Sequence, residues 1–120
     1  MDVTPAIKLT PTSSTVKLES HGGVRGRGFL YVVTSGVAIN PSAKVRKDGS
    51  YNGNNPRLVL KANPALGVAA DTVLDTLSVA ANNWEILTAA TPAPTDNGVF
   101  EVIVDCDGTA GNAFVDTIGV

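Results

Sequence analysis

Hydrophobic and polar residues alternate along much of this chain with the two-residue period typical of a β-strand that lies on a hydrophobic core. The clearest alternation runs from 98 to 107, where Phe100, Val102, Val104 and Cys106 share one face. About eight strands are predicted in this way. They cover residues 15–19, 28–34, 43–47, 57–62, 72–79, 84–88, 98–107 and 114–118.

Two of these segments depart from clean alternation. Residues 29–33 are all apolar, which predicts a strand that is covered on both faces or lies at an interface. Residues 72–79 alternate poorly, but the β-branched Thr72, Thr76 and Val79 disfavour a helix. Both segments are therefore predicted to be strands.

Clusters of Asn, Asp, Gly and Pro separate the strands. Four pairs offer residues that tolerate the left-handed backbone of tight turns: Asp48-Gly49, Asn52-Gly53, Asn97-Gly98 and Asp107-Gly108. Strands and turns at this spacing predict an all-β fold, an antiparallel β-sandwich of the jelly-roll type, over residues 15–120. Residues 1–14 are rich in Thr and Pro and are predicted to form an extended N-terminal arm that docks through Ile7 and Leu9.

Composition limits the functions that this domain can have. Only 17% of the 120 residues are charged, so much apolar surface is expected to remain, and part of it is predicted to meet other subunits. The net charge of -2 argues against a nucleic-acid partner. No apolar run is long enough for membrane insertion, and the first residues lack the pattern of a signal peptide. We therefore expect synthesis and assembly in a cytoplasm.

The last third of the chain carries a family resemblance. Trp84 opens a strand, a polar and Pro-containing connection follows at 90–97, and a long apolar strand comes next. The chain closes with a Gly-rich turn and the pattern aromatic-x-Asp-x-apolar at 111–118. From residue 28 onward the sequence resembles the carbohydrate-binding-module type of jelly roll, the galactose-binding-like fold. The resemblance implies that Trp84 packs inward. Core packing is also the expectation for the aromatic residues within strand patterns, Phe29, Tyr31, Phe100 and Phe114.

Two stretches, 45–58 and 105–111, are also similar to modules of the structural proteins of tailed bacteriophages. This resemblance implies a non-catalytic virion structural protein, either a capsid decoration (cement) protein or a β-sandwich module of a head or tail fibre. It implies capsid or fibre subunits as partners, a homo-oligomer such as a trimer, and a place on the virion surface after assembly in the host cytoplasm. The alternative function is a glycan-binding module for host-surface attachment, or an accessory domain of a glycosidase.

One loop is the candidate glycan site. Tyr51 offers an aromatic ring, and Asn52, Asn54, Asn55 and Arg57 offer groups that bond sugar hydroxyls. The structural alternative is the tip of a long hairpin with turn-forming asparagines. The sequence leaves both open.

A calcium site is a second candidate. Asp105 and Asp107 stand two residues apart at a strand end, so both carboxylates are predicted to point to one side. The resemblance adds Asp116, which matches the Asp of the family's closing strand, although the family's early Gly-Phe-Glu pattern is absent here. The alternative is a glycine turn in which Asp caps its own backbone. No other cofactor is predicted.

The sequence shows no group of residues in a pattern typical of a catalytic site. His21 has no carboxylate or nucleophile near it and is predicted to lie in a loop. Cys106 lies among apolar residues and is predicted to be a small buried hydrophobe, since a reactive thiol needs an electropositive setting. The chain is therefore not expected to be an enzyme.

Overall fold

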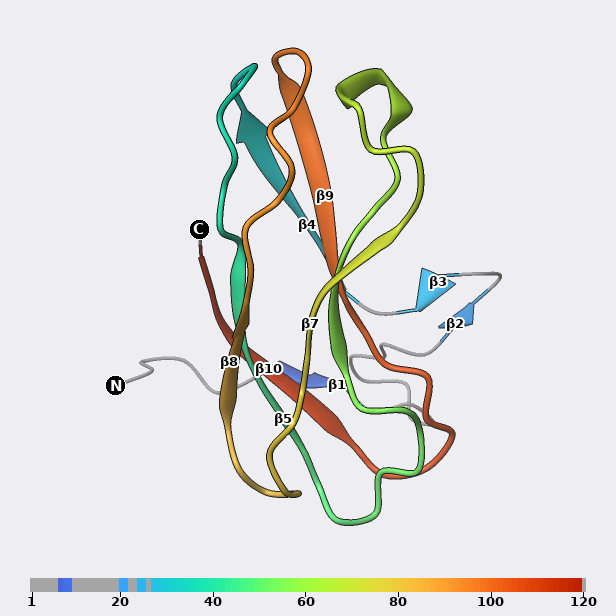
Figure 1. The fold of residues 1–120 in the computed structure, drawn as a ribbon. Helices are drawn as coiled ribbons and strands as arrows, with labels where there is room; N and C mark the ends of the chain where they lie inside the picture. The colour runs from blue at the N-terminus through green and yellow to red at the C-terminus, as the bar shows by residue number, and fades with distance from the viewer. Residues whose placement is uncertain (1–6, 10–19, 22–23, 26, 120) are drawn as a thin grey trace.

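The fold is all-β. The computed structural model describes residues 7–9, 20–21, 24–25 and 27–119 (Figure 1). Within these ranges every strand pairing is antiparallel, and two four-stranded sheets pack against one another. A single turn of 3-10 helix, η1 (Pro64–Leu66), is the only helix among the described residues, and it is far too short to span a membrane. The predicted antiparallel β-sandwich is thus confirmed.

The strand order brings together segments that are distant in sequence. The first sheet has the order β1-β10-β5-β8, from Ile7–Leu9, Ala113–Gly119, Ser42–Lys47 and Glu85–Thr88. The second has the order β4-β9-β6-β7, from Arg27–Val33, Gly98–Asp105, Arg57–Leu60 and Thr72–Thr76. Two short strands, β2 (Ser20–His21) and β3 (Val24–Arg25), pair only with each other within the described ranges.

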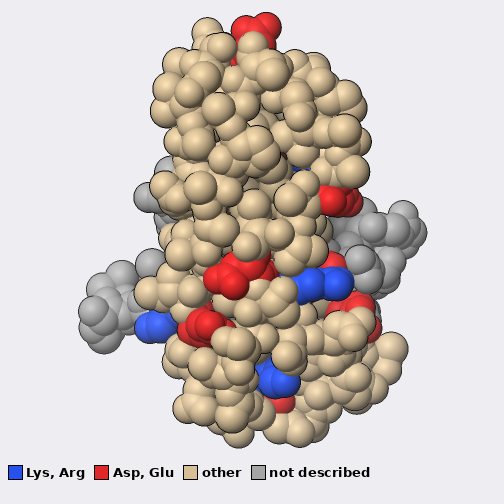
Figure 2. Space-filling model, viewed as in Figure 1, with Lys and Arg blue, Asp and Glu red and all other residues tan. Residues whose placement is uncertain are grey.

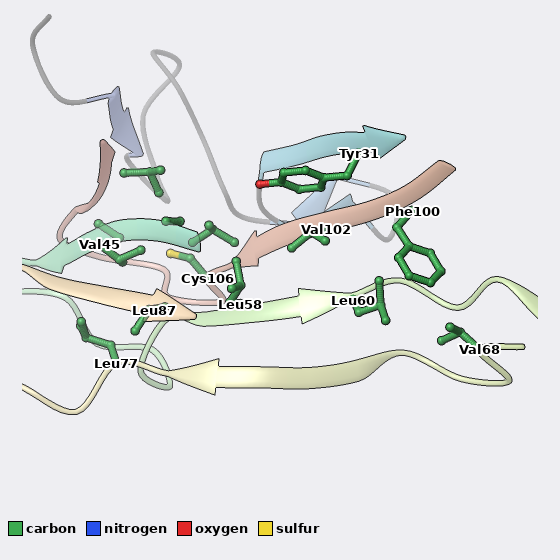
Figure 3. Packing of buried hydrophobic residues seen from close by; sticks show 14 of the residues in the cluster. Tyr31, Val45, Leu58, Leu60, Val68, Leu77, Leu87, Phe100, Val102 and Cys106 are labelled. Atoms are coloured by element: carbon green, nitrogen blue, oxygen red, sulfur yellow. The ribbon is translucent and has the colours of Figure 1, made fainter. Parts of the chain in front are cut away.

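The core lies between the two sheets, where the alternating apolar residues meet. Phe100, Val102 and Val104 of β9 are completely buried, as the alternation predicts. Leu58 and Leu60 of β6 lie beside them (Figure 3). The opposite sheet contributes its own inward residues, Ala43, Val45, Leu87, Ala113 and Val115. Burial of these side chains is the main force that holds the sheets together, at about 25 cal/mol per Å² of apolar surface.

Strand bounds agree with the predictions to within two or three residues. The predicted strand 72–79 ends at Thr76, because Leu77 leaves the ladder and turns into the core. The predicted strand 15–19 lies outside the described residues. His21 was predicted to lie in a loop, and this is wrong, since it belongs to β2.

Part of the predicted N-terminal arm belongs to the sandwich. Ile7–Leu9 forms β1 and pairs antiparallel with β10, with Ile7 opposite Val115. This backbone pairing attaches the segment to the edge of the first sheet. The rest of residues 1–14 lies outside the described ranges, so the division into an arm and a sandwich at residue 14 stays a prediction.

The apolar segment 29–33 forms most of β4, and its residues alternate between the two faces of the sheet. Tyr31 and Val33 are buried in the core. Leu30 and Val32 point outward and are 74% and 87% exposed. This chain therefore covers only one face of the strand. The predicted environment in which both faces are covered is wrong. The second, an interface, stays a prediction.

Candidate functional site

The predicted glycan residues lie in the loop between β5 and β6, and their polar groups contact the loop between β9 and β10. The Asn52 side chain accepts hydrogen bonds from the backbone N–H groups of Thr109 (2.8 Å) and Ala110 (3.0 Å). Its amide also donates to the Thr109 hydroxyl at 3.0 Å. Asn54 donates to the Asp107 carboxylate through its backbone and its side chain, at 2.8 Å each. These asparagines therefore join two loops.

Tyr51 lies at the centre of the same contact. Its hydroxyl donates to the Asn54 carbonyl oxygen at 2.8 Å and accepts from the N–H groups of Asp107 and Gly108 at 3.2 Å each. The ring is half-buried against the core, and burial raises the pKa of the phenol above its usual value. These contacts support the structural alternative for this loop. Glycan binding through Tyr51 stays a prediction.

The two remaining residues of that candidate site also have partners within the chain. Asn55 accepts a hydrogen bond from Lys47 Nζ at 2.6 Å. Arg57 forms an ion pair with Asp105, which stands directly across from it in the ladder between β6 and β9. Asp105 is only 3% exposed, so Arg57 balances a buried negative charge.

The three carboxylates predicted to bind calcium do not converge. Asp105 faces Arg57, and Asp107 accepts the two hydrogen bonds from Asn54. Asp116 lies in β10, which belongs to the opposite sheet. No group of three or more His, Cys, Asp or Glu within the described ranges is close enough to hold a metal ion. Calcium needs six or more oxygen ligands, which these three side chains do not bring together within the described ranges, so calcium binding stays a prediction.

Cys106 follows β9 on its inward face. The side chain is fully buried, as predicted, and burial raises the pKa of the thiol. A thiol that stays protonated and out of reach of solvent is a packing residue.

A further carboxylate, Asp48, connects the two loops. It accepts hydrogen bonds from the N–H and hydroxyl of Ser50 (3.1 and 3.0 Å) and from the N–H and side-chain amide of Asn112 (3.2 and 2.8 Å). Burial acts to raise the pKa of Asp48, but these hydrogen bonds together outweigh it and lower the pKa below the usual value.

A carboxylate with a depressed pKa stabilises the fold above the pKa of the unfolded chain and loses this contribution as the pH falls toward the folded value. We therefore expect the urea midpoint to fall between about pH 5 and pH 3. Asp48→Asn should be less stable than the native chain at pH 7 but should lose less on acidification. Equal acid dependence in both proteins would contradict this role of Asp48.

Sequence reasoning missed a site on the outward side of the first sheet. The Arg46 guanidinium lies 4.2 Å from the centre of the Phe114 ring and 5.1 Å from the centre of the Trp84 ring. The ammonium of Lys44 lies 5.5 Å from the same Trp84 ring. We name these four residues the Trp84 face. They come from β5, β10 and the residue before β8.

The Trp84 face corrects two predictions about the core. Phe114 and Trp84 were expected to pack inward, but both are partly exposed and neither belongs to the buried cluster. The predictions for Phe29, Tyr31 and Phe100 are confirmed. The alternation contained the signal for this face. Successive residues of a strand point to opposite faces. Val45 points inward, so its neighbours Lys44 and Arg46 point outward. Leu87 also points inward, so Trp84, three positions before it, points outward.

Comparison with known proteins identifies the fold. No protein-family model matches the sequence, and no curated protein matches it. Among solved structures, the chain is similar to that of the N-terminal CBM22-1 and GH10 modules of the Clostridium thermocellum endo-1,4-β-D-xylanase 10B in complex with xylohexaose. The TM-score is 0.57 at 17% identity, over 94% of this chain and 24% of that chain. At this identity the likeness shows a shared fold, that of a carbohydrate-binding module.

Proposed function

We propose that this chain is a non-catalytic glycan-binding module that holds its ligand on the Trp84 face. The observation that carries the proposal is the partly exposed Trp84 ring with the cationic groups of Lys44 and Arg46 over it. A sugar ring presents apolar C–H groups on its faces and hydroxyls around its rim. Its recognition therefore needs a flat aromatic surface and hydrogen-bond donors at the edge of that surface.

The geometry of Arg46 favours binding without reorganisation. Its guanidinium lies against both aromatic rings, and its Nε atom is buried, so packing holds the side chain in place before a ligand arrives. A side chain fixed in this way loses little conformational entropy on binding. Charge-assisted hydrogen bonds to carboxylates are stronger than those to neutral hydroxyls. We therefore expect acidic sugars to bind more tightly than neutral ones.

The fold likeness supports the proposal but does not specify the ligand. The similar structure contains a carbohydrate-binding module and was solved with xylohexaose. A neutral xylo-oligosaccharide and an acidic oligogalacturonate are therefore suitable first probes. Trp84 is the only tryptophan of the chain, so its fluorescence reports directly on events at this face.

Binding is tested by titrating each sugar and following tryptophan fluorescence, with calorimetry for the variants. Trp84→Ala should weaken binding of the acidic sugar about tenfold or more, because it removes the stacking surface. Arg46→Ala should weaken binding of the charged sugar even more than Trp84→Ala does. The matched control is Val73→Ala, which shortens an exposed apolar side chain on the other sheet and should leave affinity unchanged. If neither sugar binds the native chain, or if Trp84→Ala binds as the native chain does, the proposal fails.

A virion structural role is a second proposal. It is supported by the apolar side chains Leu30, Val32 and Val99, which are exposed on the outward side of the second sheet and suit contacts with other subunits. Its partners would be capsid or fibre proteins, and its place the virion surface. An electron-microscopy map of the assembled particle is the test. Density for this chain on a capsid or fibre would support the role, and its absence from purified virions would oppose it.

A further inference from the structure

We propose that β4 is a dimerisation edge, which pairs antiparallel with β4 of a second copy of this chain. The pairing would extend the β4-β9-β6-β7 sheet across a two-fold axis into a continuous eight-stranded sheet. This inference is independent of glycan binding, because the Trp84 face belongs to the other sheet.

The first argument is the position and length of β4. It is the outer strand of its sheet, and β9 is its one ladder partner within the described ranges. All seven of its residues pair with β9 without a register shift. A long, regular edge strand presents a row of backbone donors and acceptors to any strand that approaches it.

The second argument is that the other three sheet edges are protected, whereas the described residues give β4 no such protection beyond the charge of Arg27 at its first position. β7 pairs with β6 through a bulge, and its Asp75 accepts a hydrogen bond from the backbone N–H of Thr88 in β8. β8 has only four residues and carries Glu85, and β1 has only three residues. Short strands, bulges and charges are the features that prevent edge pairing in native sheets. Figure 2 shows charged side chains over the side of the molecule where β7 and β8 run.

The third argument is composition. β4 begins at the charged Arg27, but no charged residue follows from Gly28 to Ala43, and the first proline of this stretch is Pro41, beyond the strand. On the face that Figure 2 shows, the end of the molecule beyond β4 is almost free of blue and red, apart from a red group at its tip. Lys and Pro are the residues that commonly block an edge.

A second copy is the occupant because the edge is complementary to itself. In an antiparallel pairing about a two-fold axis, Leu30 of one copy can stand opposite Val32 of the other, and the reverse pair forms on the far side of the axis. These two residues are the most exposed large apolar side chains described, at 74% and 87%. Two exposed apolar side chains per copy make a small contact, below the roughly 800 Å² per partner of a standard stable interface. We therefore infer a dimer with a dissociation constant in the micromolar range.

Sedimentation velocity over a concentration series of the full chain tests the inference, with hydrogen exchange of the β4 amides as a second measurement. The native chain should shift from monomer to dimer as the concentration rises from about 1 μM to about 1 mM. Amide protection in Gly28–Val33 should rise with it. Val32→Lys should weaken dimerisation tenfold or more, because it brings an ammonium against the apolar Leu30 of the second copy.

Val73→Lys is the matched control. It places the same charge at an exposed valine on the opposite edge strand of the same sheet, and it should dimerise as the native chain does. Both variants should unfold at about the native urea concentration, since both sites are exposed. A native chain that remains monomeric throughout the series, or equal weakening by the two variants, would overturn the inference.

Discussion

Replacement of Gly111 by alanine is expected to destabilise the sandwich by about 3 kcal/mol or more. Gly111 has a φ of +75°, which a residue with a side chain adopts only at a cost. Its added Cβ would also clash with the backbone of Ser50 and Tyr51, lying 2.5 Å from Tyr51 Cα. Backbone atoms cannot rotate away as a side chain can, so the two loops would have to separate.

Gly36→Ala is the matched control for this prediction. Gly36 has a similar φ of +78°, but no atom lies within 4 Å of the position that its Cβ would occupy. The free energy of unfolding of this variant should therefore fall only by the conformational cost of the positive φ, about 1 kcal/mol. Urea unfolding of the two variants separates backbone strain from the clash between loops. Equal losses would show that the close approach of Gly111 to Tyr51 does not exist in solution.

Arg57→Ala is expected to cost about 3 kcal/mol, because it removes the guanidinium from the ion pair with the buried Asp105 carboxylate. Asp105 is 3% exposed and Arg57 27% exposed, so solvent can replace little of the lost interaction. The measurement is the free energy of unfolding at pH 7. A large loss identifies Arg57 as a structural residue of the second sheet.

Lys61→Ala provides the comparison. Lys61 pairs with Asp71 at 2.8 Å, but their side chains are 36% and 50% exposed, so this variant should cost less than about 1 kcal/mol. If Arg57→Ala is instead as stable as the native chain and fails to bind sugar, then Arg57 belongs to a glycan site around Tyr51. That result would favour the site predicted from the sequence over the Trp84 face.

The fold could be predicted because strand periodicity is local. Phe100, Val102 and Val104 alternate with polar residues, and a sheet buried on one face requires that alternation. The alternation within 57–62 likewise places Leu58 and Leu60 on one face, and both are buried in the core. Which strands become neighbours was not predictable, because the order β4-β9-β6-β7 depends on contacts between residues far apart in the sequence.

The sites were harder to predict because they depend on long-range contacts. Asn52 and Asn54 have the composition of a sugar-binding loop, but their partners Thr109 and Asp107 lie more than fifty residues away. The roles of the turn glycines also depend on contacts with residues distant in the sequence. Gly108 does not adopt a positive φ, and its small size instead allows Tyr51 to approach, since a Cβ there would lie 2.6 Å from Tyr51 Cε1.

Trp84 was misplaced for a different reason. The family resemblance implied an inward ring, whereas parity with the buried Leu87 three residues later places it outward. Here the local pattern was the better guide. The cation–π contacts with Lys44 and Arg46 then followed from the pairing of β8 beside β5, which the sequence does not reveal.

The most direct measurement of the central claim is an NMR titration of the isotope-labelled chain with the acidic oligosaccharide. The single tryptophan gives one indole N–H signal, so Trp84 is observed without ambiguity. We predict that this signal and those of Lys44, Arg46 and Phe114 shift on titration, while the signals of Tyr51 to Asn55 do not. Shifts confined to the Tyr51 loop, or none anywhere at millimolar sugar, would contradict the account.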